Sequence, residues 1–145
     1  MRMVREHCPI CDARAVVVTE EREVRIGARV TRVPEEFYRC TECSEEFFRP
    51  EQMNAAQIRA SERIRTEDDL LSPSEIRAIR QGLGLSQRDF ETLLRIGPKT
   101  VVRWEKGTVF QNRATDSLLR VVREFPEAAR FLAERSGVAI RRTAA

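Results

Sequence analysis

The chain has 145 residues, of which 41% are hydrophobic and 34% are charged, a composition typical of a soluble globular protein with one ordinary domain or two small ones. No apolar run approaches the length of a membrane-spanning helix, and residues 1–6 lack the apolar stretch of a secretory signal. We therefore expect a cytoplasmic protein with no membrane partner.

The charges divide unevenly along the chain. Residues 1–68 contain 12 basic and 14 acidic side chains, a net charge of −2, whereas residues 69–145 contain 14 basic and 9 acidic ones, a net charge of +5. Binding to the phosphates of double-stranded DNA requires a positive surface. The C-terminal half is therefore the part suited to a nucleic-acid partner.

Two Cys-x-x-Cys motifs, 28 residues apart, mark the N-terminal part; their cysteines are Cys8, Cys11, Cys40 and Cys43. Each motif forms a tight turn with two thiolates aimed at one spot, and two such turns supply the four ligands of a tetrahedral ion. Four cysteines leave no open coordination position, so we expect one structural zinc ion per chain. Two disulfides, or iron held by the same thiolates, are the alternatives; a cytoplasmic chain argues against disulfides, and the sequence does not exclude iron.

The sequence between the two motifs predicts short, partly alternating strands with a turn at Gly27–Ala28. Residues 1–48 would thus form a small β domain closed by the metal. His7, the single histidine, is interpreted as a bystander, with a role as an alternative ligand left open. We expect Phe47 and Phe48 to cover a core too small to close by itself.

Residues 49–69 predict a partly exposed linker helix, and residues 70–138 predict five further helices. The first of the five would be capped near Ser72 and bury the stripe Ile76, Ile79 and Leu83. The last begins at Pro126. The expected fold class is α+β with two domains, a four-cysteine β domain followed by an all-α domain.

Two short helical patterns meet at one break inside the all-α domain. Ser86 can cap the first, whose apolar residues fall on one face, and Gly97–Pro98 is typical of the start of the second. Val101 and Trp104 would point inward and leave Lys99, Thr100 and Arg103 outward. This pattern predicts a helix-turn-helix that reads DNA, and the alternative is a plain amphipathic helical hairpin.

The predicted DNA contacts follow from the geometry of the major groove. A helix from about Pro98 to Trp104 would lie in the groove, where Arg103 can donate two hydrogen bonds to guanine O6 and N7. Lys99 and Thr100 would reach neighbouring base edges or phosphates. Gln87, at the start of the preceding helix, would bind a phosphate together with backbone N–H groups.

The segments Leu85–Gln87 and Arg103–Gly107 resemble the Xre/Cro-type repressor family, which has a Gln at the start of its second helix and an Arg-Trp-Glu-x-Gly at the end of its third. The resemblance implies the repressor-type helical fold for the C-terminal half. Two positions depart from the family pattern. Glu91 stands where a small Ala is usual, and Arg95 stands where a turn Gly is usual.

Along nearly its whole length the chain resembles the MqsA/YgiT-type antitoxins, because the four-cysteine domain, the linker and the helix-turn-helix follow in that order, as does the pattern from Leu118 to Glu127. The resemblance implies a homodimer formed through the C-terminal domain. It further implies that the N-terminal domain contacts a cognate toxin, commonly an mRNA-cleaving ribonuclease, while the C-terminal domain represses the operon. Lys99 and Arg103 match two positions that contact operator bases in the family, where the first is Asn.

We therefore expect an antitoxin of a type II toxin–antitoxin system that binds a palindromic operator. A free-standing zinc-containing transcription regulator of the Xre family is the alternative. An enzyme, such as a metal-dependent hydrolase, is disfavoured because the four-cysteine set is closed and neither a second histidine nor a carboxylate pair accompanies it.

Overall fold

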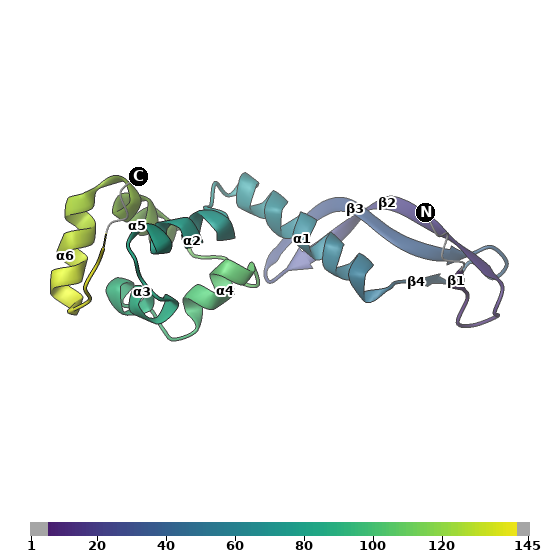
Figure 1. The fold of residues 1–145 in the computed structure, drawn as a ribbon. Coiled ribbons are helices and arrows are strands. Elements are labelled where there is room, and N and C mark those ends of the chain that lie inside the picture. Colours follow the sequence, from purple (N-terminus) through teal and green to yellow (C-terminus); the bar gives the residue numbers. More distant parts are fainter. Residues whose placement is uncertain (1–5, 142–145) are drawn as a thin grey trace. The chain divides into compact units, whose positions relative to one another are not determined.

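The computed structural model describes residues 6–141, and its secondary structure is α+β, as the sequence predicted (Figure 1). The strands are β1 (Glu6–His7), β2 (Arg14–Ile26), β3 (Arg29–Cys40) and β4 (Glu46–Phe47), and the helices are α1 (Pro50–Glu67), α2 (Pro73–Gly82), α3 (Gln87–Leu94), α4 (Thr100–Lys106), α5 (Arg113–Glu124) and α6 (Pro126–Ser136). The chain divides into two compact units between Ile64 and Arg65, within α1. No helix of the described residues is long and apolar enough to cross a membrane.

The N-terminal unit is built on one long hairpin in a sheet of order β1-β2-β3-β4. Strands β2 and β3 pair antiparallel from Ala15 opposite Cys40 to Ile26 opposite Arg29, so the connecting loop is Gly27–Ala28, as predicted. Gly27 has a φ of +60°, which a glycine adopts without steric cost at the first loop position of a type II′ turn.

The prediction of several short strands was wrong, because β2 and β3 are continuous over 13 and 12 residues. The charged stretch in the middle of β2 stays in the ladder because its side chains find partners on one face. Arg22 donates to Glu46 at 2.7 Å and lies 3.8 Å from the centre of the Phe37 ring, and Arg39 donates to Glu46 at 2.8 Å. These pairs let polar residues cover the ring that forms the centre of the small core.

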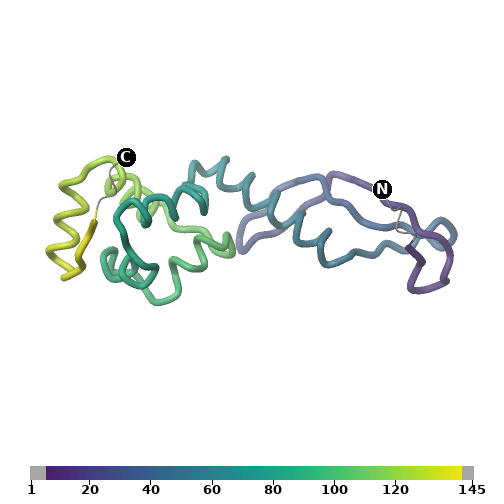
Figure 2. Tube along the Cα trace, viewed as in Figure 1, coloured from purple at the N-terminus to yellow at the C-terminus, as the bar shows by residue number. Residues whose placement is uncertain are grey.

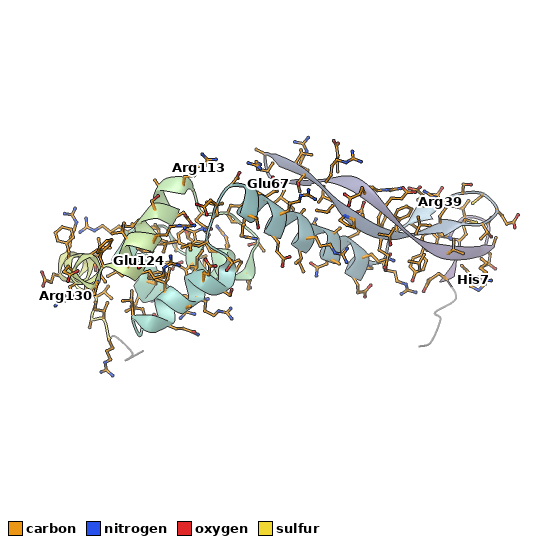
Figure 3. All side chains as sticks on the ribbon, turned by 90° about the horizontal axis from the view of Figure 1, so that it is seen from above. His7, Arg39, Glu67, Arg113, Glu124 and Arg130 are labelled. Atoms are coloured by element: carbon orange, nitrogen blue, oxygen red, sulfur yellow. The ribbon has the colours of Figure 1, made fainter. Side chains whose placement is uncertain are left out.

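Helix α1 lies along the hairpin within the N-terminal unit (Figures 1 and 3). Its buried residues Ala56, Ala60 and Ile64 recur every four positions, on one face of the helix. Arg59 and Arg63 donate to the backbone carbonyls of β3 at Pro34 and Arg32, at 3.1 and 2.7 Å. The aromatic pair after the second motif covers the core as expected, since Phe47 stacks on Tyr38 and Phe48 packs against Phe37.

The C-terminal unit contains α2 to α6, traced from teal to yellow in Figure 2. Helix α4 packs against α2 and α3, and α6 packs against α3 and α5. The predicted caps are confirmed: Ser72 accepts the N–H of Glu75 and Ser86 accepts that of Asp89. The apolar core consists of Leu71, Ile76, Ile79, Leu83, Leu85, Phe90, Leu93, Leu94, Val101, Trp104, Leu119, Val122, Ala129 and Ala133.

The buried Asp116 joins the start of this unit to α5. Its carboxylate accepts the backbone N–H of Leu71 at 2.8 Å, the Gln111 amide at 3.0 Å and the Arg120 guanidinium at 2.8 Å. Burial acts to raise the pKa of Asp116, but these donated hydrogen bonds outweigh it and lower the pKa below its ordinary value. The group therefore remains an acceptor-only carboxylate, which is what three donors require.

Candidate functional site

The sheet brings the four cysteines to one place. Cys8 and Cys11 lie in the loop between β1 and β2, Cys40 ends β3, and Cys43 lies in the loop before β4. Their four Sγ atoms all lie within 4.8 Å of one another. The antiparallel pairing of Ala15 with Cys40 sets the two loops side by side, so the ladder register positions the cluster.

The sulfur separations fit a tetrahedral ion. Cys8 Sγ lies 3.5 Å from Cys43 Sγ, and Cys11 Sγ lies 3.5 Å from Cys40 Sγ and 3.6 Å from Cys43 Sγ. The edge of a tetrahedron with zinc–sulfur bonds of about 2.3 Å is about 3.8 Å, close to these values. A disulfide would require about 2.05 Å, and all four cysteines are free thiols.

Backbone N–H groups stabilise the thiolate form that a metal needs. Ile10 N–H points at Cys8 Sγ at 3.3 Å, and the N–H groups of Glu42 and Cys43 point at Cys40 Sγ at 3.4 and 3.5 Å. The hydrogen bonds from Cys43 and Glu42 lower the pKa of Cys40 to about 6. At Cys43 a backbone hydrogen bond near Glu45 acts to lower the pKa, but the neighbouring thiols and burial outweigh it and raise the pKa to about 12. His7 lies outside this cluster, with Nδ1 3.1 Å from the carbonyl of Asp12. The four cysteines thus suggest a zinc site.

The second candidate region is the pair α3 and α4. The expected start of the second helix at Pro98 was wrong, because α4 begins at Thr100 with Lys99 as its N-terminal cap residue. Lys99 has φ +65°, and its side chain makes no capping hydrogen bond. Pro98 lies in a turn that the Thr100 hydroxyl closes by donating to the carbonyl of Gly97 at 2.7 Å.

Glu91 supplies the cap that Lys99 does not. It is buried on α3, with 8% of its surface exposed, and its Oε2 accepts the backbone N–H of Val101 at 3.0 Å. A carboxylate at this point satisfies a free N–H in the first turn of α4 and complements the positive end of the helix. The departure from the usual Ala therefore has a structural role here.

Arg95, the second departure, ends α3 in the left-handed conformation, with φ 54° and ψ 45°. Its backbone N–H bonds back to the carbonyls of Glu91 and Thr92, so the turn has the glycine-type geometry although the residue is Arg. The guanidinium donates to the carbonyl of Arg135 at the end of α6, at 3.3 Å.

A buried carboxylate also fixes the other end of α4. The side chain of Glu105 is 1% exposed; its oxygens accept Arg80 at 2.7 Å, Arg77 at 3.3 Å and the Gln87 amide at 2.7 Å. Burial acts to raise the pKa of Glu105, but hydrogen bonds from Arg80 and Gln87 outweigh it and lower the pKa. We expected Gln87 to bind a phosphate. In the structure it is half-buried, and one of its side-chain amide N–H groups donates to Glu105.

The outer face of α4 carries the other predicted contacts. Val101 and Trp104 are buried, as predicted, whereas Lys99 and Arg103 are exposed and Thr100 is half-buried. Within residues 6–141, the Arg103 guanidinium makes no hydrogen bond or ion pair. The structure therefore presents a free guanidinium on a short helix that is fixed at both ends.

Comparison with known proteins bears on both regions. The family model of the MqsA antitoxin, described as the antitoxin component of a bacterial toxin–antitoxin system, matches residues 3–133. The chain belongs to the MqsA antitoxin family. This membership supports an antitoxin role, and it suggests a regulator rather than an enzyme.

A curated relative points the same way. The antitoxin HigA-2 of Vibrio cholerae serotype O1 is 34% identical over 64 residues, which cover 44% of this chain. The aligned part spans 62% of the length of that relative.

Sequence reasoning missed the roles of Glu91 and Glu105. In the sequence both are simply charged residues in predicted helices. Helical spacing, however, places Glu91 on the inward side with Leu94, and Glu105 on the inward side with Val101. A charged residue on an apolar face is a signal for a buried hydrogen bond, and it could have identified both.

The metal site yields a prediction about composition and folding. We expect one zinc ion per chain, measured by elemental analysis. Its removal by a chelator should unfold the sheet while α2 to α6 remain helical. Without the ion no bond holds the four clustered thiols together, and the N-terminal core is small. Hydrogen exchange resolved along the chain checks this. Bound iron, or a sheet that stays protected without metal, would contradict it.

The cap yields a prediction about stability. Glu91→Ala should lower the free energy of unfolding by about 1–2 kcal/mol, because the Val101 N–H loses its acceptor inside the protein. The matched variant Glu91→Gln keeps an acceptor oxygen and should lose less than half as much. Urea titrations followed by Trp104 fluorescence measure both. Equal stability of Glu91→Ala and the unmodified chain would show that the cap contributes nothing.

Proposed function

We propose that this chain is the antitoxin of a type II toxin–antitoxin system, which represses its own operon through α3 and α4 and neutralises a cognate toxin through its N-terminal unit. The observation that carries the DNA-binding part is the exposed, unpaired Arg103 on a helix anchored by Glu91 and Glu105. In this proposal α3 and α4 are the two helices of a helix-turn-helix, and residues 70–138 are the domain that binds DNA and dimerises.

Helix α4 is the reading helix in this proposal. Arg103 donates two hydrogen bonds to guanine O6 and N7, the contact for which a planar guanidinium is suited. Thr100 and Lys99 lie toward the N-terminal end of the helix, which enters the groove deepest in such motifs. The backbone N–H groups at the start of α3, with the second amide N–H of Gln87, hold a phosphate.

We propose a dimer, which is supported by the short reading helix and by the apolar surface of α5, α6 and the residue between them. One helix of 7 residues contacts few bases, so two copies on a palindromic operator are needed for useful affinity. Val121, Phe125 and Phe131 are 42%, 57% and 62% exposed. We place the dimer contact on these side chains, because a second copy would remove their apolar surface from water.

Zinc held by Cys8, Cys11, Cys40 and Cys43 is structural in this proposal. When bound, the ion supplies four metal–sulfur bonds that join the loop after β1 to the loop after β3. Cys8 and Cys40 are buried at 3% exposure each, and the N–H groups around them orient the sulfurs. No step of a reaction is assigned to this site.

The toxin contact is placed on the hairpin. Strand β1 pairs only with Arg14 and Ala15 of β2, so among the described residues the outer edge of β2 is open from Val16 onward. Val16 and Val17 on it are 40% and 53% exposed. An open edge with apolar side chains suits a partner that adds a strand or covers it. We infer that this partner is the cognate toxin, which in the family is commonly an mRNA-cleaving ribonuclease.

The DNA-binding proposal predicts the effect of one substitution. Arg103→Ala should weaken operator binding by the equivalent of about 1–3 kcal/mol per half-site and relax the preference at one base pair, with thermal stability unchanged. Arg88→Ala removes the same charge from α3 and should weaken binding to all sequences alike. Titrations against single-base operator variants decide it. Unchanged affinity and preference in Arg103→Ala would show that α4 does not read the groove.

The toxin proposal is tested by co-expressing the full chain with the neighbouring open reading frame. A stoichiometric complex is expected, and Val17→Glu should weaken it because a charge enters the open edge. Ile58→Glu on α1 is the matched control, since that side chain is 51% exposed in the same unit. Absence of any complex would favour a free-standing zinc-containing regulator of the Xre family.

A further inference from the structure

Val102 is an apolar residue on the outer face of α4. Val102 and Arg103 come three and four residues after Lys99 and four and three residues before Lys106, so these side chains lie on one side of the helix. Val101, Trp104 and Glu105 occupy the buried side. Within residues 6–141, Val102 belongs neither to the apolar core nor to the partly buried apolar side chains packed against it. Val102 is half-buried, but the apolar core does not account for its position.

Val102 borders a hollow on the surface between α3 and α4. The hollow has a volume of about 410 Å³ and is lined by Gln87, Arg88, Glu91, Pro98, Lys99 and Val102. Val102 and Pro98 make its wall apolar, while Arg88 and Lys99 place positive charge beside it. Glu91 also reaches it, but one of its carboxylate oxygens accepts the Val101 N–H. An apolar wall beside two positive side chains suits a ligand that carries an apolar group on a negatively charged backbone.

We propose that Val102 is a specificity-determining residue that contacts the C5 methyl group of a thymine in the major groove, beside the base pair read by Arg103. Thymine is the base that displays a methyl group there, and apolar side chains recognise it by contact. Val102 and Arg103 are consecutive on the outer face and point about 100° apart around the helix, so in this proposal they contact neighbouring base pairs. Arg88 and Lys99 hold the phosphates on either side. The inference rests on the proposed DNA-binding function.

The test removes the methyl group from either partner. A duplex that the full chain selects from a random library is remade with deoxyuridine in place of each thymine in turn. Deoxyuridine at one position per half-site should weaken binding about fourfold. This factor corresponds to ~0.8 kcal/mol, the free energy of burying one methyl group. Val102→Ala should bind the thymine duplex about as weakly and show no further loss with deoxyuridine. Helix α4 should remain intact, because Ala is a good helix former.

The controls separate this inference from the function on which it rests. Val30→Ala makes the same change on β3 of the other unit, where the side chain is 42% exposed, and should retain the full sensitivity to deoxyuridine. If Arg103→Ala alters base preference while no deoxyuridine position affects the unmodified chain, DNA reading stands and the role of Val102 is refuted. Continued sensitivity of Val102→Ala to deoxyuridine also refutes it. If the library yields no preferred sequence, both proposals fail.

Discussion

The buried carboxylate of Glu105 is the interaction on which the C-terminal unit depends most. A helix of 7 residues is not stable alone, since nucleation is costly and few hydrogen bonds follow it. Glu105 joins this helix to Arg77 and Arg80 of α2 and to Gln87 of α3. Glu91 does the same at the other end through the Val101 N–H. Helix α4 therefore holds a fixed orientation, and among the described residues the Arg103 guanidinium on its outer face makes no internal hydrogen bond or ion pair.

Four thiols have the corresponding role in the N-terminal unit. Its apolar core is small, and a long hairpin with charged side chains has little tendency to close at its open end. The cysteine cluster lies at that end, where β2 and β3 are farthest from their connecting turn. A metal there would close the end by bonds rather than by burial, and the surface of the hairpin would stay available to a partner.

The two units stabilise a short or thin element in different ways. In our proposal each unit presents a short or thin element to a partner, and each stabilises that element with polar side chains. In the C-terminal unit these groups are carboxylates paired with Arg and backbone N–H groups. In the N-terminal unit they are thiols oriented by backbone N–H groups. The surfaces for DNA and toxin that we propose can therefore vary in sequence without loss of the scaffold.

The sequence by itself determined the local features of this protein. The spacing of the two cysteine motifs predicted a four-sulfur cluster, Ser72 and Ser86 predicted helix starts, and the order of the motifs indicated the MqsA antitoxin family. These features depend on neighbours in the chain, so local pattern suffices for them. Tertiary structure alone decided the length of the hairpin, because its charged middle depends on Arg22 and Arg39 meeting Glu46. It also decided the start of α4 at Thr100, because the Glu91 carboxylate that caps this helix comes from another helix, and sequence spacing does not show which side chains meet across a turn.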